Sequence, residues 1–250
     1  MRLTIYAILL IQLNNIKNIK TAVILAGGKG TRLQEVVSDV PKPMAPINNR
    51  PFLEYLLDYW IQQGITKFIL SVGYMKDSIM NHFGDNYKAA SIEYAEETNP
   101  LGTGGGLLLG SKDITETFIL INGDTFIEID IKSMHKFHLS RQSEWTFSLF
   151  NSKQLDRYMG MDVDTNGKII SLFSKEVNLN NWVNGGVYII NPAVLTKVKY
   201  QSGSYMSLED NFLPSLFLTN ARVYGMQTKG KFIDIGVPED YFRAQDIFLD

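Results

Sequence analysis

Cysteine is absent from this sequence of 250 residues, and histidine occurs only three times, as His82, His135 and His138. Without cysteine the chain has no disulfide framework, no thiolate nucleophile and no cysteine-ligated zinc site, and we expect it to work in the reducing cytoplasm. The histidines do not form an HExxH pair of metal ligands. We predict that His135 and His138 are ordinary surface residues.

The sequence also lacks a long hydrophobic run. The apolar stretch at residues 5–13 falls well short of the ~20 residues that a membrane-crossing helix requires, so no membrane span is expected. A cleaved secretory signal is not expected either, because the stretch leads through residues 14–20 directly into the first predicted strand. Residues 1–20 then form an N-terminal extension, and the sequence leaves open whether it is an added strand or helix or the result of an upstream start codon.

Neither sign of charge is in excess. Lysine and arginine number 24 against 26 aspartates and glutamates, which gives a formal net charge of -2, and no basic block is present that would follow a nucleic-acid backbone. We therefore expect no nucleic-acid partner. Hydrophobic residues make up 45% of the chain, which excludes a disordered regulator and is enough for one large core. With no linker, repeat or low-complexity tract, residues 21–250 are predicted to form a single domain.

From residue 21 onward, short β-branched runs alternate with amphipathic helices, which is typical of an α/β fold with a mixed, mostly parallel sheet and helices on both faces. Strands are predicted at residues 21–25, 67–72, 91–95 and 117–121, and helices at residues 51–63, 77–83, 103–110 and 131–142. Further on, the alternation indicates a smaller antiparallel portion, with strands at residues 145–150, 160–164, 169–173 and 183–190.

A glycine-rich turn follows the first predicted strand, with the sequence Leu-Ala-Gly-Gly-Lys-Gly-Thr-Arg-Leu over residues 25–33. Ligands of open α/β sheets bind at the carboxyl ends of the strands, where this turn lies. Glycine lets backbone N–H groups approach phosphates closely, and Arg32 adds a charged fork of donors for phosphate oxygens. The turn is neither a Walker A loop nor a complete Rossmann fingerprint. It predicts a nucleotide-binding loop made by Ala26, Gly27, Gly28, Gly30 and Thr31.

A second motif follows further along the chain. Lys42 stands between Pro41 and Pro43, and the two prolines hold it in a stiff, extended segment, where it is a fixed positive charge for a phosphate. The order of a GGxGTR loop, a spacer and PKP resembles the signature of the sugar-phosphate nucleotidyltransferases. The resemblance extends from around Thr21 to the end of the chain, and it implies a Rossmann-like nucleotidyltransferase domain.

The resemblance implies an enzyme that joins a nucleoside triphosphate to a sugar 1-phosphate and releases pyrophosphate, with no covalent enzyme intermediate. Positioning and charge neutralisation supply most of the catalysis in such reactions. The implied catalytic residues are Arg32, Lys42 and Lys175. Relatives usually carry Glu-Lys at the last of these positions, whereas the order here is Ser174-Lys175-Glu176, so the acid that contacts the sugar at this position stays open.

Residues 97–105, Glu-Thr-Asn-Pro-Leu-Gly-Thr-Gly-Gly, resemble the family's loop that holds the nucleobase and then opens a helix. A carboxylate at Glu97 would accept hydrogen bonds from both N1–H and the exocyclic amine of guanine, which favours GTP. The alternative is that Glu97 is a solvated loop acid. The nucleotide-binding residues implied for this loop are Glu97, Pro100, Gly102 and Thr103.

Two aspartates at predicted strand ends, Asp124 and Asp234, look like the metal-binding pair of the family. Mg²⁺ is commonly held by one or two carboxylates together with substrate phosphates, so Mg²⁺ is the implied cofactor. The sugar-binding residues implied by the resemblance are Asn122, Asn184, Gly185 and Glu209. For Glu209 the alternative is a helix-capping arrangement with Ser207 as the N-cap.

Within the family, residues 40–47 and 234–241 look most like the guanosyltransferases that act on D-glycero-D-manno-heptose 1-phosphate for bacterial surface glycans. The implied partners are GTP and this sugar phosphate. Transfer from another nucleoside triphosphate to mannose, glucose or N-acetylmuramate 1-phosphate is an alternative, and an inactive nucleotide-sugar sensor is an alternative of another class. The sequence leaves open whether the chain forms a homo-oligomer.

Overall fold

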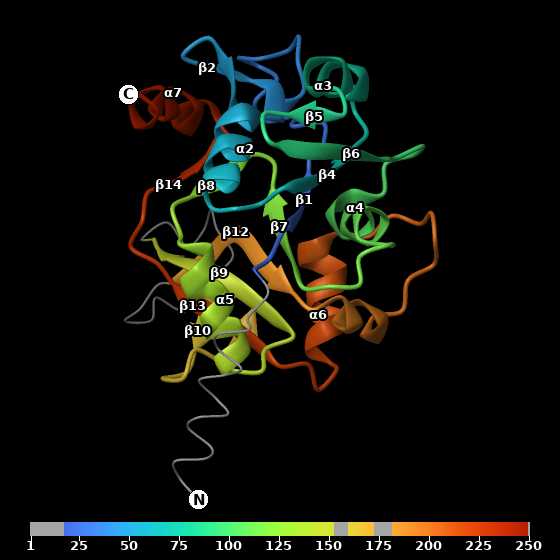
Figure 1. The fold of residues 1–250 in the computed structure, drawn as a ribbon, viewed down its shortest axis with the longest axis vertical. Helices are drawn as coiled ribbons and strands as arrows, with labels where there is room; N and C mark the ends of the chain where they lie inside the picture. The colour runs from blue at the N-terminus through green and yellow to red at the C-terminus, as the bar shows by residue number, and fades with distance from the viewer. Residues whose placement is uncertain (1–17, 153–159, 173–181, 250) are drawn as a thin grey trace, which may run out of the picture.

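The computed structural model describes residues 18–152, 160–172 and 182–249. An eight-stranded sheet runs through the molecule in the strand order β13-β9-β12-β7-β1-β4-β6-β5 (Figure 1). Its strands are β1 (Thr21–Leu25), β4 (Lys67–Val72), β5 (Asn86–Tyr87), β6 (Ala90–Glu96), β7 (Phe118–Asn122), β9 (Trp145–Asn151), β12 (Trp182–Ile190) and β13 (Val223–Gln227).

The middle of the sheet is parallel. β1 lies between β4 and β7, β4 pairs with β6, and all of these pairs are parallel. The buried positions of β1, β4 and β7 are apolar except for Ser71, as expected for parallel strands that are covered on both faces. Along β1, Ala22 and Ile24 join one hydrophobic core and Val23 joins the other, because successive side chains point to opposite faces. β12 is antiparallel to both β7 and β9, so the sheet is mixed, as predicted.

Helices cover both faces of the sheet (Figure 1). One core contains side chains of α2 (Phe52–Gln62), α3 (Lys76–Phe83), α5 (Ile131–Ser140) and α7 (Pro238–Ile247). The other contains side chains of α4 (Gly102–Gly110), α6 (Leu213–Phe217) and the short helices η2 (Pro192–Lys197) and η3 (Leu208–Phe212). This arrangement confirms the predicted α/β class. Within the described ranges, no helix is both long and apolar enough to span a membrane.

Three small antiparallel pairs and one short helix complete the described elements. The pairs are β2 (Pro46–Ile47) with β3 (Arg50–Pro51), β8 (Thr125–Ile127) with β14 (Phe232–Asp234), and β10 (Met161–Val163) with β11 (Ile169–Leu172), and the helix is η1 (Lys42–Met44). The pair of β8 and β14 matters most for the site, because its register places Asp234 opposite Thr125 and therefore beside Asp124.

The prediction for two of the histidines was wrong. His135 and His138 lie on α5 and are buried, with exposed fractions of 8% and 2%. His138 Nδ1 lies 2.8 Å from Thr146 Oγ1 of β9, so the imidazole has a polar partner in the interior. The spacing of histidines along a helix could not reveal this partner, because Thr146 belongs to the strand that follows the helix.

Candidate active site

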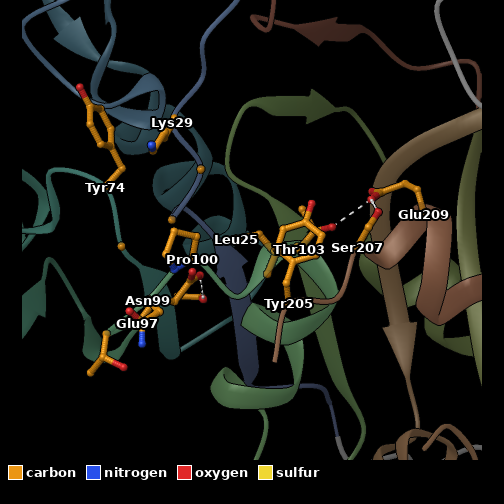
Figure 2. Close-up of a pocket in the computed structure, with 16 residues that line it drawn as sticks. Leu25, Lys29, Tyr74, Glu97, Asn99, Pro100, Thr103, Tyr205, Ser207 and Glu209 are labelled. Atoms are coloured by element: carbon orange, nitrogen blue, oxygen red, sulfur yellow. Dashed lines mark hydrogen bonds between the residues drawn. The ribbon is translucent and has the colours of Figure 1, made fainter. Parts of the chain in front are cut away.

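The candidate site lies at the carboxyl ends of the parallel strands. Along the chain, β4 and β6 are added on one side of β1 and β7 on the other, and such a change of direction leaves a crevice at the strand ends. A cavity of about 700 Å³ opens there, lined by residues of the segments 25–29, 71–74, 97–103 and 205–209. Figure 2 shows Glu97, Asn99 and Pro100 at one end of this cavity and Ser207 and Glu209 at the other.

The glycine-rich turn begins as a continuation of β1. Ala26 is buried and its N–H donates to Ser71 O at 2.8 Å, while Gly27 O accepts from Tyr74 N at 3.1 Å. A Cβ atom on Gly27 would lie 2.5 Å from Oε1 of Glu97. Glycine at position 27 therefore leaves the space that the Glu97 carboxylate occupies.

The rest of the turn is more open. Gly28 lines the cavity, and a Cβ on it would meet no atom within 4 Å. Gly30 has a φ of +60°, and a Cβ on it would lie 3.0 Å from Cβ of Lys42, so the turn packs directly against the lysine of the second motif. Thr31 and Arg32 follow on an exposed turn. The two sequence motifs are thus brought together in space.

Glu97 is held in place by its own loop. Its Oε2 accepts from Leu101 N at 2.9 Å, and its Oε1 accepts from Ser71 Oγ at 3.3 Å. The carboxylate also lines the cavity, together with Pro100. These contacts differ from those of a freely solvated loop acid.

Gly102 and Thr103 face the opposite wall of the cavity. Gly102 has a φ of +74°, and a Cβ on it would lie 2.6 Å from Met206 O, so only glycine fits this contact. Thr103 Oγ1 donates to Glu209 Oε2 at 2.9 Å and accepts from Leu208 N at 2.8 Å. Burial raises the pKa of the Glu209 carboxyl above its usual value.

Lys42 forms an ion pair beside the glycine-rich turn. Its Nζ donates to Asp124 Oδ2 at 2.7 Å, and the two side chains are 11% and 31% exposed. Burial alone would raise the pKa of the Asp124 carboxyl, but the charge and the hydrogen bond of Lys42 outweigh this effect and hold the pKa below its usual value. Asp124 is therefore a carboxylate at neutral pH.

Asp234 reaches the same place from β14. Its Oδ1 accepts from Gly236 N at 2.7 Å, and Ile235 N donates to Asp124 O at 3.0 Å. A Cβ on Gly236 would lie 2.7 Å from Asp234 Oδ1 and 3.3 Å from Lys42 Nζ, so these groups surround that glycine. Within the described ranges, no group of three or more His, Cys, Asp or Glu side chains could hold a metal ion. The donor set is two carboxylates, which suits a divalent metal that takes its other ligands from phosphates and water.

Asn184 and its neighbours form a polar cluster on β12. Asn184 Nδ2 donates to the hydroxyl of Tyr188 at 2.7 Å, and Asn184 Oδ1 accepts from Gly186 N at 3.0 Å. Tyr188 is fully buried, and burial raises the pKa of its hydroxyl. Asn122 belongs to the same region, because a Cβ on Gly186 would lie 3.2 Å from Asn122 Nδ2, and Asn122 Oδ1 is buried without a described partner.

Two of the predicted site residues stand apart from this geometry. Gly185 is buried, and a Cβ on it would lie 2.5 Å from Cδ1 of Ile127 and 2.6 Å from Oγ of Ser148, so this glycine packs against side chains of the interior. Lys175 lies outside the described residues, together with Ser174 and Glu176.

Comparison with known proteins identifies the family to which this chain belongs. A family model described as Nucleotidyl transferase matches residues 21–250 of the chain. The chain belongs to the nucleotidyl transferase family. This match confirms the family and the enzyme class predicted from the two motifs.

This nucleotidyl transferase is similar to the D-glycero-alpha-D-manno-heptose 1-phosphate guanylyltransferase of Aneurinibacillus thermoaerophilus. The two sequences are 41% identical over 225 residues, which covers 90% of this chain and 96% of that protein. It is 36% identical over 222 residues to the protein of the same name from Campylobacter jejuni, covering 89% of this chain and 97% of that protein. The crystal structure of HddC from Yersinia pseudotuberculosis complexed with GMP-PN superposes with a TM-score of 0.79 at 34% identity, covering 92% of this chain and 100% of that chain.

Three aromatic residues of the nucleotidyl transferase site were missed by the sequence analysis. Tyr74 and Tyr205 line the cavity, and the hydroxyl of Tyr188 accepts a hydrogen bond from Asn184. Tyr74 had a usable signal, because it follows a predicted strand of the parallel sheet at its carboxyl end. Tyr205 had none, since it is placed by contacts with a segment about a hundred residues earlier, where its ring would meet a Cβ on Gly102 at 2.9 Å.

Proposed function

We propose that this chain transfers GMP from GTP to D-glycero-alpha-D-manno-heptose 1-phosphate. The proposal depends on the 41% identity of this chain to a D-glycero-alpha-D-manno-heptose 1-phosphate guanylyltransferase, along 96% of the length of that protein. A relative with a TM-score of 0.79 is complexed with the guanine nucleotide analogue GMP-PN, which supports a guanine nucleotide in the same cavity.

The proposed reaction is an in-line displacement at the α-phosphorus of GTP. A phosphate oxygen of the sugar 1-phosphate forms the new bond to phosphorus, the bond to the bridging oxygen of the β-phosphate breaks, and pyrophosphate leaves with that electron pair. The attacking phosphate is already ionised near neutral pH, so no side chain has to remove a proton. The work of the protein is then to place the phosphates and to offset their charge.

The residues suited to this work surround the glycine-rich turn. The backbone N–H groups of the turn and the exposed Arg32 would hold the triphosphate. Lys42 Nζ, fixed by its 2.7 Å contact with Asp124, would neutralise charge at the reacting phosphates. We assign the same charge-neutralising role to Lys175 on the family resemblance alone.

Mg²⁺ is the cofactor that we propose for the two carboxylates. The family generally uses a divalent metal, and Asp124 and Asp234 are hard oxygen donors at the ends of paired strands. When bound, the ion would neutralise phosphate charge next to Lys42. Lys42 donates to Asp124 Oδ2 in this structure, and a carboxylate has about four lone-pair sites, so Asp124 could hold the ion and still accept the hydrogen bond from Lys42.

The decisive experiment measures pyrophosphate release with Mg²⁺ across GTP, ATP, UTP, CTP and dTTP. Each nucleotide is paired with the 1-phosphates of D-glycero-D-manno-heptose, mannose, glucose and N-acetylmuramate. We expect turnover with GTP and the heptose. Turnover with a different pair would keep the enzyme class and reject this substrate, and silence across the whole grid would favour the nucleotide-sugar sensor.

Glu97 is the residue that we propose reads guanine. Glu97→Gln should raise the KM for GTP by at least about tenfold, because an amide cannot accept from both N1–H and the exocyclic amine. Glu96→Gln is the matched control, since Glu96 is an exposed neighbour paired with Lys76. If Glu97→Gln leaves the preference for GTP over UTP unchanged, Glu97 does not read the base.

A further inference from the structure

The wall of the cavity that faces Glu97 is built by residues 205–209, and backbone hydrogen bonds attach it to the start of α4. Met206 N donates to Leu101 O at 2.7 Å, and Met206 O accepts from Gly104 N at 2.8 Å and from Gly105 N at 3.1 Å. The carbonyl of Met206 therefore satisfies N–H groups that a helix N-terminus leaves free. Because Gly104 N and Gly105 N already donate to Met206 O, the first turn of α4 holds the segment 205–209 in place.

Thr103 extends this attachment into the cavity. Its hydroxyl accepts from Leu208 N at 2.8 Å and donates to Glu209 Oε2 at 2.9 Å. A threonine hydroxyl has one hydrogen, so this hydrogen is committed to the Glu209 carboxylate. The resemblance implies that Thr103 binds the nucleotide, but in this arrangement its hydroxyl hydrogen points to Glu209.

Ser207 does not replace Thr103 as the side-chain donor to Glu209. Ser207 Oγ lies 3.4 Å from Glu209 Oε2 but 2.9 Å from Asp210 Oδ2, and it accepts from Asp210 N at 3.0 Å. Ser207 is thus engaged as the N-cap of η3, while Thr103 supplies the nearer donor to Glu209. Ser207 therefore caps η3, as the alternative interpretation expects, while Glu209 also lines the cavity.

From these contacts we propose that Thr103 is a positioning residue for sugar recognition, whose hydroxyl holds the Glu209 carboxylate at the cavity wall to accept hydrogen bonds from hydroxyl groups of the sugar 1-phosphate. The proposal rests on the proposed function. Sugar hydroxyls are donors and a carboxylate is an acceptor, so a carboxylate fixed in advance selects sugars whose hydroxyls match its direction. The contact also links the nucleobase loop, which leads into Thr103, to the sugar side of the cavity.

The test uses the pair of substrates that the wild-type enzyme turns over most rapidly in the grid. Thr103→Val removes the hydroxyl and keeps the shape, and it should raise the KM for the sugar 1-phosphate about tenfold while the KM for the nucleoside triphosphate stays within about twofold. Thr103→Ser restores a hydroxyl and should restore the KM. Thr103→Ala leaves room for water at Leu208 N, and it serves the same purpose if the valine variant does not fold.

A double-mutant cycle separates positioning from a general structural effect. In a Glu209→Ala background, Thr103→Val should change the KM for the sugar 1-phosphate by less than about twofold, because its effect acts through the carboxylate. Thr196→Val, which removes an exposed hydroxyl bonded to Ala193 O, controls for loss of a threonine hydrogen bond. Equal effects of Thr103→Val in both backgrounds, or a raised KM for the nucleotide instead, would overturn the proposal. Failure of the wild type on the whole grid would instead overturn the proposed function.

Discussion

At the scale of single residues, Lys42 has the most constrained charge of the site. Its side chain is 11% exposed, and its ammonium group lies 2.7 Å from Asp124 Oδ2. Removing one partner of such a pair leaves the other charge poorly compensated. The side chain also packs along Gly30, so the position of the ammonium group is set by both motifs.

We expect Lys42→Ala to lower kcat/KM by about a hundredfold or more, because a preorganised positive charge is lost from the reacting phosphates. Steady-state pyrophosphate release measures the effect. Lys67→Ala is the control, since it removes a half-buried lysine away from the cavity that is also paired at 2.7 Å, with Glu93. A rate close to that of the wild type would remove Lys42 from the catalytic residues.

At the scale of elements, a series of buried hydrogen bonds connects α5 to β9. His138 Nδ1 meets Thr146 Oγ1 at 2.8 Å, and Thr146 Oγ1 donates to Ser143 Oγ at 2.9 Å. Burial lowers the pKa of His138 to about 4, and the neighbouring His135 contributes further. The imidazole is therefore neutral in the folded protein at pH 7.

This contact predicts a loss of stability on acidification. Unfolded histidine takes up a proton near its ordinary pKa of about 6.5, whereas folded His138 does so only near 4, so the unfolded state gains protons first as the pH falls. Between pH 7 and 5 the free energy of unfolding should fall by about 2 kcal/mol from this group.

Urea unfolding of the wild type and of His138→Asn at the two pH values tests this expectation, because asparagine retains a polar group near the Nδ1 position. The variant should lose stability less steeply than the wild type. His82→Asn is the control, since His82 is exposed and should leave the slope as it is. The same slope in all three proteins would show that His138 does not contribute.

At the scale of the whole molecule, the cavity depends on segments from distant parts of the chain. Its walls come from residues 25–29, 71–74, 97–103 and 205–209, and the two cores lie on opposite faces of a single sheet. A ligand in the cavity therefore contacts segments that are as far apart in the sequence as residues 25–29 and 205–209. Binding should stabilise the molecule as one unit.

We expect GTP with Mg²⁺, at about a hundred times its Kd, to stabilise the fold by about 2.7 kcal/mol. For a domain of this size that energy corresponds to a rise in Tm of roughly 5–10 °C, measured by a thermal shift assay. UTP at the same concentration should give a smaller rise under the proposed role of Glu97, because uracil lacks the two adjacent donors of guanine. Equal shifts with all nucleotides would argue against base recognition in this cavity.

Sequence alone determined the features that depend on neighbouring residues. Strands such as β1, β4 and β7 were predictable because burial on both faces leaves continuous apolar runs in the chain. The glycine-rich turn, Lys42 and Glu97 were predictable as candidates, since each lies in a short motif with its own spacing. These signals were enough to identify the family and the fold class, and the comparisons confirm both.

Only the tertiary structure decided which partners these residues contact. Thr103 looks like part of the nucleobase loop in the sequence, yet its hydroxyl is bonded to Glu209, and Gly102 is required by the approach of Met206. His138 was expected at the surface and is buried against Thr146. Periodicity reports which side of an element is apolar, whereas a hydrogen bond between residues about a hundred positions apart depends on how the elements pack. That packing became visible only in the folded molecule.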